Sequence, residues 1–224
     1  MNSERVKKSA CKTPEEMLSY ERDLWSGGLR YVAGIDEAGR GPLAGPVVAA
    51  AVVFPVGSFI PTVDDSKVLT PEQREELYEQ IRSEALAVGV GIVDHVVIDE
   101  INILNATFRA MHEAISQLPF APEYLLIDGN RFTSDIAPGS TAGIPFTTIV
   151  DGDARCFSIA ASSIIAKVTR DRLMLEYDVQ FPGYGFAHNK GYATEEHREA
   201  IALLGFCPIH RRTFHLKSQL ELEF

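Results

Sequence analysis

The segment that most constrains this chain is GIDEAGRGPLAGP, at residues 34–46. Two adjacent carboxylates, Asp36 and Glu37, close an apolar run, and the glycines and prolines that follow lead into a second apolar run at residues 47–54. This pattern predicts a strand that ends in two acids, a turn with accessible backbone amides, and a return strand. We therefore expect the chemistry of the protein at this turn.

The same tripeptide, Ile-Asp-Glu, recurs at residues 98–100 and provides an internal comparison. There it stands without glycines, in a segment whose apolar spacing is helical. Most Asp-Glu pairs are solvated surface charge. The surrounding sequence, rather than the acids themselves, therefore assigns chemistry to Asp36 and Glu37 and a surface role to the second pair.

Composition places the chain among ordinary globular proteins. It has 224 residues, of which 46% are hydrophobic and 23% charged, and this length suits one domain with at most an appendage. No apolar stretch is long enough to span a bilayer, and the polar N-terminus does not look like a secretory signal. The three cysteines form no CxxC pair, so we expect no disulfide framework, no zinc site and a reducing, cytoplasmic setting.

The net charge of -10 argues against non-specific binding of nucleic acid, which depends on Lys and Arg. Two features would nevertheless favour the binding of nucleic acid. Divalent cations at clustered acids would reverse the local field. In addition, the last quarter of the chain carries a group of basic residues: Lys167, Arg170, Arg172, Lys190, Arg198, Arg211, Arg212 and Lys217.

Periodicity predicts alternating strands and helices. We expect strands at residues 31–35, 47–54, 87–93, 124–127 and 146–150. We expect helices at residues 14–25, from Pro71 onward with Thr70 as the cap, and at residues 97–102, 105–118, 155–177 and 194–204. Residues 131–143 have the composition of a loop, and the tail is basic and then amphipathic. This alternation is typical of an α/β protein with a mixed sheet.

Three of the predicted strands end in acids, namely Asp36 with Glu37, Asp128, and Asp151 or Asp153. In open α/β folds ligands gather where strands end, so we expect these acids to meet. Their repulsion is costly unless a cation lies between them, and oxygen ligands favour Mg²⁺ or Mn²⁺. Two such ions about 4 Å apart can hydrolyse a phosphodiester. The Asp128-Gly129 pair could instead be an ordinary turn.

Several short motifs together resemble a known family, the bacterial type 2 ribonucleases H (ribonuclease HII). The resemblance covers about residues 31–214 and depends on the order of the whole set rather than on any one motif. The motifs are GIDEAGRGP at 34–42, DSK at 65–67, ILNAT at 103–107, IDGN at 127–130, GD at 152–153, AASSIIAKVTRD at 160–171, YGF at 184–186, KGY at 190–192 and HRR at 210–212.

The resemblance implies an α/β, RNase H-like fold, with a mixed sheet of about five strands flanked by helices and a helical C-terminal extension. Residues 1–29 have the pattern of a lead-in with one short amphipathic helix, and we expect the catalytic domain at residues 30–224. The implied enzyme hydrolyses the RNA strand of RNA–DNA hybrids and cuts 5′ to single ribonucleotides in duplex DNA, as in ribonucleotide removal during replication and repair. We expect a monomer with these nucleic acids as partners and with no membrane partner.

Matched position by position, the family's catalytic and metal-binding acids correspond to Asp36, Glu37, Asp128 and Asp153. By resemblance, Asp36 would bridge two Mn²⁺ or Mg²⁺ ions, and attack by a metal-bound water would leave a 5′-phosphate and a 3′-hydroxyl. The family usually has Lys where this chain has Asp151, which makes Asp151 a rival ligand. We favour Asp153, because its distance to the downstream helix and to Tyr192 matches the family.

Further positions match the family's substrate contacts. Residues Gly39, Arg40 and Gly41 resemble its ribose-reading loop, where glycines let the backbone approach the 2′-hydroxyl that marks RNA. Tyr192 resembles the tyrosine that packs on the sugar at the RNA-to-DNA step. The resemblance also suggests three phosphate contacts, each of which could instead be solvated surface charge: Lys67, Lys167 and Arg170.

Two functions of other classes stay open at this point. A non-catalytic RNA–DNA hybrid binding module would bind without metal and without cleavage, and the complete set of acids argues against it. A metal-dependent phosphatase of small nucleotides would turn over a free nucleotide but not a duplex.

Overall fold

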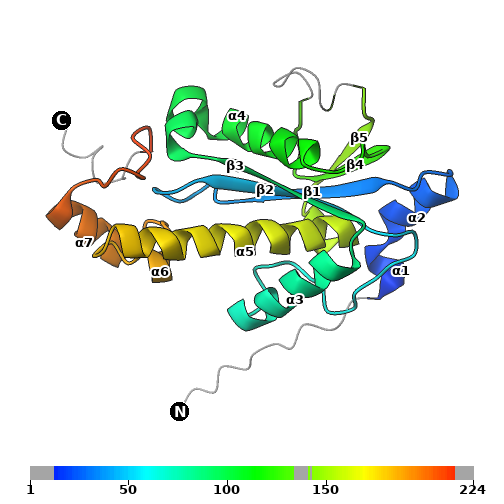
Figure 1. Ribbon diagram of the computed structural model, residues 1–224, viewed down its shortest axis with the longest axis horizontal. Coiled ribbons are helices and arrows are strands. Elements are labelled where there is room, and N and C mark those ends of the chain that lie inside the picture. The colour runs from blue at the N-terminus through cyan, green and yellow to red at the C-terminus, as the bar shows by residue number, and fades with distance from the viewer. Residues whose placement is uncertain (1–12, 134–140, 142, 215–224) are drawn as a thin grey trace, which may run out of the picture.

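The computed structural model describes residues 13–133, 141 and 143–214 of the chain. Its centre is a five-stranded sheet in the order β3-β2-β1-β4-β5 (Figure 1). The strands are β1 (Val32–Ala38), β2 (Val47–Val53), β3 (Ala87–Val93), β4 (Tyr124–Asp128) and β5 (Phe146–Ile149). The strands β3, β2 and β1 are antiparallel, whereas β4 runs parallel to β1 and β5 parallel to β4. The strand β1 therefore lies where the antiparallel and parallel halves of the sheet meet.

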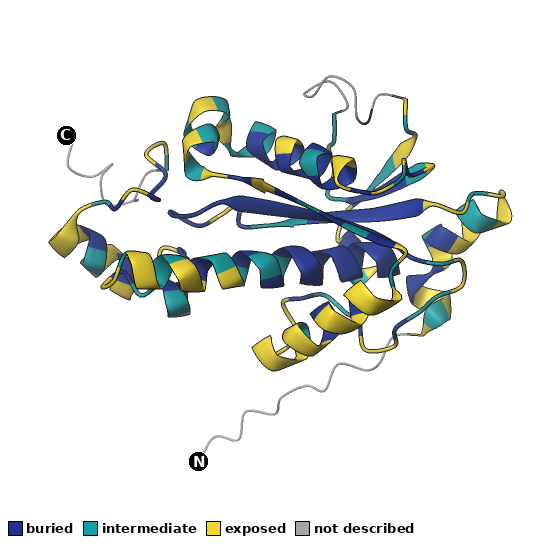
Figure 2. Cartoon of the chain, in the orientation of Figure 1, coloured by how far each residue is buried: buried dark blue, intermediate teal, exposed yellow. Residues whose placement is uncertain are grey.

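Helices cover both faces of this sheet. The helix α4 (His95–Ser116) lies on one face, and α5 (Phe157–Gln180) with α3 (Pro71–Glu84) lies on the other (Figure 1). Every residue of β2 is buried, because alternate residues pack against α4 and against α5. Figure 2 shows the buried sheet between the buried sides of the helices. Burial on both faces explains why this strand is a continuous apolar run in the sequence.

The helix α5 lies unusually close to β1. A Cβ atom on Gly34 would lie 2.2 Å from the backbone carbon of Ser158, so a residue with a side chain would push the strand and the helix apart. The first turns of α5 bring alanines and serines to the contact, among them Ala160 and Ala161, which are fully buried. The strand that carries Asp36 is thereby fixed against the beginning of α5.

The predicted lead-in packs on the same helix end. It forms α1 (Pro14–Met17) and α2 (Ser19–Ser26), and the buried Glu21 of α2 reaches the beginning of α5. Glu21 Oε1 accepts hydrogen bonds from the backbone N (2.9 Å) and Oγ (2.8 Å) of Ser158 and from Cys156 Sγ (3.1 Å). The N-cap residue Cys156 provides no side-chain cap of its own. Because a helix N-terminus favours negative charge, Glu21 caps α5 from outside the helix.

Beyond α5 the chain forms α6 (Phe186–Asn189) and α7 (Glu195–Leu204) and then returns to the glycine turn. An isolated antiparallel bridge joins Ala44 to His210. The returning segment is anchored by Asp99, which accepts hydrogen bonds from the backbone N of Arg212 (2.7 Å) and of Thr213 (3.0 Å). The second Asp-Glu pair therefore contains a structural anchor, which a purely surface role did not anticipate.

Most predicted elements are confirmed, with a few instructive differences. The strand β1 extends through both acids to Ala38, and the two helices expected around residues 97–118 form α4, with a left-handed residue, Asn102 (φ 66°), between them. The capping box of Thr70 and Gln73 is present. Two short helices were not predicted, η1 (Gly152–Ala154) and α6. Most of the loop at 131–143 and the tail at 215–224 lie outside the described residues.

Candidate functional site

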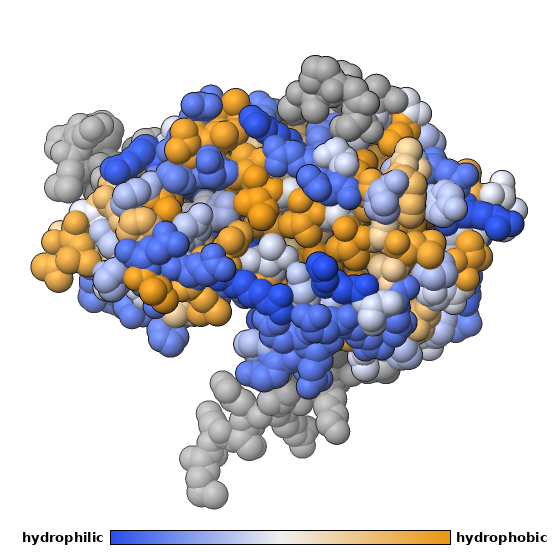
Figure 3. Space-filling view, in the orientation of Figure 1, coloured by the Kyte–Doolittle hydropathy of each residue, from blue (hydrophilic) through white to orange (hydrophobic). Residues whose placement is uncertain are grey.

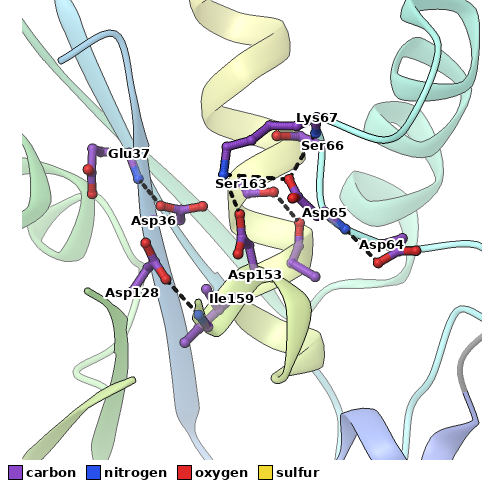
Figure 4. Close-up of polar contacts among 12 residues, drawn as sticks. Asp36, Glu37, Asp64, Asp65, Ser66, Lys67, Asp128, Asp153, Ile159 and Ser163 are labelled. Atoms are coloured by element: carbon purple, nitrogen blue, oxygen red, sulfur yellow. Dashed lines mark hydrogen bonds and ion pairs between the residues drawn. The ribbon is translucent and has the colours of Figure 1, made fainter. Parts of the chain in front are cut away.

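Two of the predicted acids meet at the junction of β1 and β4. The parallel register pairs Ile35 with Ile127, so the next residues along the two strands, Asp36 and Asp128, lie side by side. Successive side chains of a strand point to opposite faces, and Asp36 shares the face of Gly34, against α5. Figure 4 shows the carboxylates of Asp36 and Asp128 facing each other, with Glu37 turned to the other side of β1.

The third acid position is supplied by η1, which lies between β5 and α5. Asp128 Oδ1 accepts a hydrogen bond from the backbone N of Gly152 at 2.7 Å, and a Cβ on Gly152 would lie 3.1 Å from that same oxygen. The next residue, Asp153, is 5% exposed and points toward Asp36 (Figure 4). Its rival Asp151 is exposed, with a left-handed backbone (φ 54°). The structure thus brings Asp153, and not Asp151, into the cluster.

The electrostatics of this cluster are those of crowded negative charge. Burial raises the pKa of Asp36 well above its usual value, and the charges of Glu37, Asp128 and Asp153 raise it further. Burial also raises the pKa of Glu37, against the lowering effect of Arg40. The pKa of Asp128 is raised by burial, with a smaller contribution from Asp153. A bound cation would relieve both the repulsion and the loss of hydration.

Within the described residues, no three acidic, histidine or cysteine side chains already surround a common point as ligands of one ion. Each carboxylate is instead held by a donor of the protein. The backbone N of Glu37 donates to Asp36 Oδ1 (2.7 Å), Arg40 Nη1 donates to Glu37 Oε1 (3.2 Å), and Lys67 Nζ donates to Asp153 Oδ2 (2.8 Å). The all-oxygen donor set suits a hard divalent ion such as Mg²⁺ or Mn²⁺, provided that these side chains turn.

The positive charge of the Lys67 ammonium group partly neutralises the cluster of acids in this structure. Its ammonium group lies 2.8 Å from Asp153 and 3.7 Å from Asp65. The hydrogen bond to Asp153 is the main cause that raises the pKa of Lys67, and the charges of Asp65 and Asp36 act in the same direction. Asp65, whose own pKa is raised mainly by burial, is a fifth acid beside the cluster that sequence reasoning missed. Its position in the DSK motif was the only available signal.

A pocket of about 240 Å³ opens in front of the acids. Asp36, Glu37 and Asp128 line it, together with all of the predicted substrate contacts, namely Gly39, Arg40, Gly41, Lys67, Lys167, Arg170 and Tyr192. The ring of Tyr192 is 46% exposed and lies beside Gly41, where an added Cβ would be 3.5 Å from Tyr192 Cε1. Lys167 pairs with Asp171 at 2.7 Å. Hydrophilic side chains cover α3, near this part of the surface (Figure 3).

The structure does not leave Arg170 exposed, as a phosphate contact would require. Arg170 is 1% exposed, and its guanidinium donates to the backbone oxygens of Pro46 (3.0 Å), Lys190 (3.0 Å) and Ala44 (3.1 Å). Pro46 and Ala44 are buried, and Lys190 is half-buried. Arg170 therefore supports the wall of the pocket, and its sequence position alone could not distinguish this role from an exposed contact.

Two buried histidines support Tyr192 from behind, and sequence reasoning gave them no such role. His197 Nδ1 lies 2.8 Å from the backbone oxygen of Tyr192, which can only accept, so Nδ1 carries a proton. His197 Nε2 then accepts from His210 Nε2 at 3.1 Å, and His210 Nδ1 accepts from the backbone N of Cys207 at 3.0 Å. These contacts are consistent with one pair of tautomers, in which both imidazoles are neutral.

Comparison with known proteins agrees with this geometry. The family model described as Ribonuclease HII matches residues 33–217. A ribonuclease HII of Geobacter metallireducens is 58% identical over 201 residues, which cover 87% of this chain and 91% of that protein. Among solved structures, the PCNA:RNase HII complex from Archaeoglobus fulgidus aligns with a TM-score of 0.68 at 29% identity, over 84% of this chain and 96% of that chain.

Bst-RNase HIII in complex with Mn²⁺ aligns with a TM-score of 0.56 at 19% identity, over 78% of this chain and 70% of that chain, which supports the fold alone. The family match includes all four predicted acids, the glycine turn and Tyr192. Both the extent of the match and the identity to the Geobacter protein are far above what chance similarity gives. The chain therefore belongs to the ribonuclease HII family of ribonuclease H enzymes, which depend on divalent metal ions and act on RNA–DNA hybrids.

Proposed function

We propose that the enzyme cuts 5′ to single ribonucleotides embedded in duplex DNA, besides hydrolysing the RNA strand of RNA–DNA hybrids. The observation that carries this proposal is the position of the glycine turn and Tyr192 along the same pocket as Asp36 and Asp128. A turn with glycines on both sides of Arg40 lets the backbone approach the shallow minor groove, where a single 2′-hydroxyl distinguishes RNA from DNA. The proposed biological role is the removal of ribonucleotides during DNA replication and repair.

In this proposal, Asp36, Glu37, Asp128 and Asp153 hold two divalent ions, Mg²⁺ or Mn²⁺. Ions bound there would activate a water molecule and stabilise the leaving oxygen, which gives a 5′-phosphate and a 3′-hydroxyl. Glu37 would leave Arg40, and Asp153 would leave Lys67, before either could act as a ligand. Lys67 and Lys167 would then be free to meet phosphates of the substrate, and the ring of Tyr192 would pack on the sugar.

A labelled DNA duplex that contains one ribonucleotide tests this function. With Mg²⁺ or Mn²⁺ we expect one cut on the 5′ side of the ribonucleotide, and an intact all-DNA duplex in the parallel reaction. Treatment of the products with phosphatase and ligase identifies the ends. Failure to cut beside the ribonucleotide, with efficient hydrolysis of a continuous RNA strand in the same preparation, would restrict the enzyme to hybrids.

The alternatives from other classes have distinct outcomes in the same assay. Binding of the duplex in EDTA without any cleavage when metal is added would favour a binding module, against the family membership. Turnover of a free nucleotide but not of a duplex would favour a phosphatase.

No helix among the described residues is long and apolar enough to cross a membrane. The monomeric state, the cytoplasmic location and the division at residue 30 stay predictions.

We also infer a protein partner of the PCNA kind. The ribonuclease HII of Archaeoglobus fulgidus forms a complex with PCNA. In this chain the sequence at residues 219–224 is QLELEF, in which Leu220, Leu222 and Phe224 alternate with polar residues. A short motif of this composition suits recognition through apolar side chains that enter pockets of a partner. A chain without residues 219–224 should cut naked duplexes normally and no longer co-elute with the partner; unchanged co-elution contradicts the inference.

A further inference from the structure

Two buried arginines lie beneath the glycine turn, and they are an unusual feature of the site. Arg170 and Arg211 are each 1% exposed. Within the described part of the chain, the hydrogen bonds of both guanidinium groups go to backbone carbonyls, and neither group is ion-paired with a carboxylate. Burial lowers the pKa of Arg170 to about 10 and that of Arg211 to about 9, which leaves both protonated at neutral pH. Two positive charges therefore lie under the turn.

Arg211 holds the turn by its carbonyl oxygens. Its Nη2 donates to the oxygen of Gly39 at 2.6 Å, its Nη1 to that of Arg40 at 3.0 Å, and its Nε to that of Gly45 at 3.0 Å. The turn lies directly on the guanidinium groups, since a Cβ on Gly39 would be 2.1 Å from Arg170 Nε. Carbonyl hydrogen bonds of this kind are what make a buried cation tolerable.

The orientation of these carbonyls determines where the neighbouring amides point. In a planar trans peptide the C=O and the following N–H point in opposite directions. Because the oxygens of Gly39 and Arg40 point inward to Arg211, the N–H groups of Arg40 and Gly41 point outward. Neither N–H donates to another atom of the described residues, and both residues line the pocket beside Tyr192. Adjacent backbone N–H groups over a positive charge form a receptor for an oxygen atom.

We propose that Arg211 is a positioning residue for ribose recognition, which turns the N–H groups of Arg40 and Gly41 toward the pocket so that they bind the ribose 2′ oxygen of the substrate. This inference rests on the proposed function and deepens it. The side chain of Arg211 lies behind the turn and touches no substrate. Its planar fork is what orients two successive peptides at once, and a lysine ammonium at the same place cannot reproduce that fork.

Arg211→Lys keeps the positive charge and removes the fork, and Arg212→Lys is its matched control. The side chain of Arg212 is exposed and lies over the ring of Phe206, away from the turn. For each variant we would measure KM for a duplex with one ribonucleotide, and the inhibition constant Ki of an all-DNA duplex added as a competitor. The first quantity includes ribose contacts, whereas the second reports the contacts shared by both duplexes.

We expect Arg211→Lys to raise KM about tenfold, since one or two hydrogen bonds to the ribose are lost. The Ki of the DNA competitor should not change, and Arg212→Lys should change neither constant. An unchanged KM for Arg211→Lys would overturn the proposal. So would an equal rise of KM and Ki, because this would indicate a general effect on the fold or on phosphate binding. If the wild-type enzyme does not cut at the ribonucleotide, the proposed function fails instead.

A measurement on the wild-type chain keeps the inference testable if Arg211→Lys does not fold. Amide hydrogen exchange, followed by NMR, should be fast at Arg40 and Gly41 in the free, metal-free protein. Addition of the duplex with one ribonucleotide should protect both amides, whereas an all-DNA duplex should not. Amides that are already protected in the free protein, or that both duplexes protect equally, contradict the proposal.

Discussion

Asp36 is the residue on which the electrostatics of the site depend most. It is buried, and the carboxylates of Glu37, Asp128 and Asp153 all raise its pKa further. In the absence of a divalent ion, this crowding costs stability, because folding brings together charges that are separated in the unfolded chain. The same crowding is what would make a divalent ion bind tightly. Loss of the charge of Asp36 should therefore make the metal-free protein more stable and the metal-bound protein less active.

The variant Asp36→Asn tests this opposition. Asparagine retains an oxygen that can accept from the backbone N of Glu37, so the local hydrogen bond can survive. We expect unfolding in urea without metal to require more free energy than in the wild type, because the variant removes one buried negative charge from the crowded cluster. We expect cleavage to be lost. A variant that is less stable without metal, or that still turns over substrate, contradicts this account of Asp36.

Lys67 should compete with a bound cation, because its ammonium group holds Asp153. Replacement by glutamine removes the positive charge and keeps most of the side-chain length. We expect Lys67→Gln to bind Mn²⁺ about two- to fivefold more tightly in calorimetry, while its KM for the duplex rises through loss of a phosphate contact. Weaker binding of Mn²⁺ by the variant would mean that Lys67 organises the acids rather than competing for them.

At the scale of elements, the N-terminal lead-in has a definite structural role. Its helix α2 carries the buried Glu21, which accepts three hydrogen bonds at the beginning of α5. The helix α5 in turn lies against β1 and follows η1, so it positions both Asp36 and Asp153. We therefore expect the lead-in to act on the stability of the fold and not on the chemical step.

Glu21→Ala should lower the free energy of unfolding by about 2 kcal/mol, because buried donors at the beginning of α5 lose their acceptor. Glu15→Ala is the control, since Glu15 is exposed and its ion pair among the described residues is the one with the exposed Arg22, at 3.5 Å. Glu15→Ala should change the free energy of unfolding by no more than about 0.5 kcal/mol. Urea unfolding monitored by circular dichroism measures both variants. Equal effects of the two substitutions would remove the capping role of Glu21.

The sequence predicted the elements well where the pattern was local. The alternation of apolar runs located all five strands, and the capping box located α3 to the residue. It missed η1, because a single turn leaves no periodicity, and it could not anticipate Asn102, whose left-handed backbone lies inside an otherwise helical pattern.

The roles of the arginines and histidines could not be predicted for a different reason. They depend on contacts between residues far apart in the chain, such as Arg211 with Gly39 and His197 with His210. No local pattern distinguishes a buried arginine that supports a turn from an exposed one that meets phosphate. The acids were easier to identify, since they stand at or just after the ends of three strands that the apolar pattern predicts.

For the whole molecule, the neutral histidine pair predicts a dependence of stability on pH. Burial lowers the pKa of His197, and burial together with the charge of His197 lowers that of His210 from 6.5 to about 4. The charges of Arg212 and His95 make smaller contributions to this lowering. At these two histidines the unfolded chain therefore binds more protons than the folded one below about pH 6.5. The stability from this pair is complete above that value and is lost as the pH falls toward 4.

We expect the free energy of unfolding to fall by about 2 kcal/mol between pH 7 and pH 4.5 through this pair. His210→Gln should reduce the slope of stability against pH, whereas His188→Asn, at an exposed position, should leave it unchanged. Urea unfolding across this pH range gives the comparison. The same slope in all three proteins would assign the loss of stability to other groups.

The central claim is that carboxylates distant in the sequence share divalent ions in one pocket. Anomalous scattering from crystals of the full chain soaked with Mn²⁺ tests it most directly. The account predicts two manganese peaks about 4 Å apart, with Asp36 touching both and with Glu37, Asp128 and Asp153 completing the set. Crystals with no manganese at Asp36, or with the ion held by Asp151 outside the pocket, would contradict it.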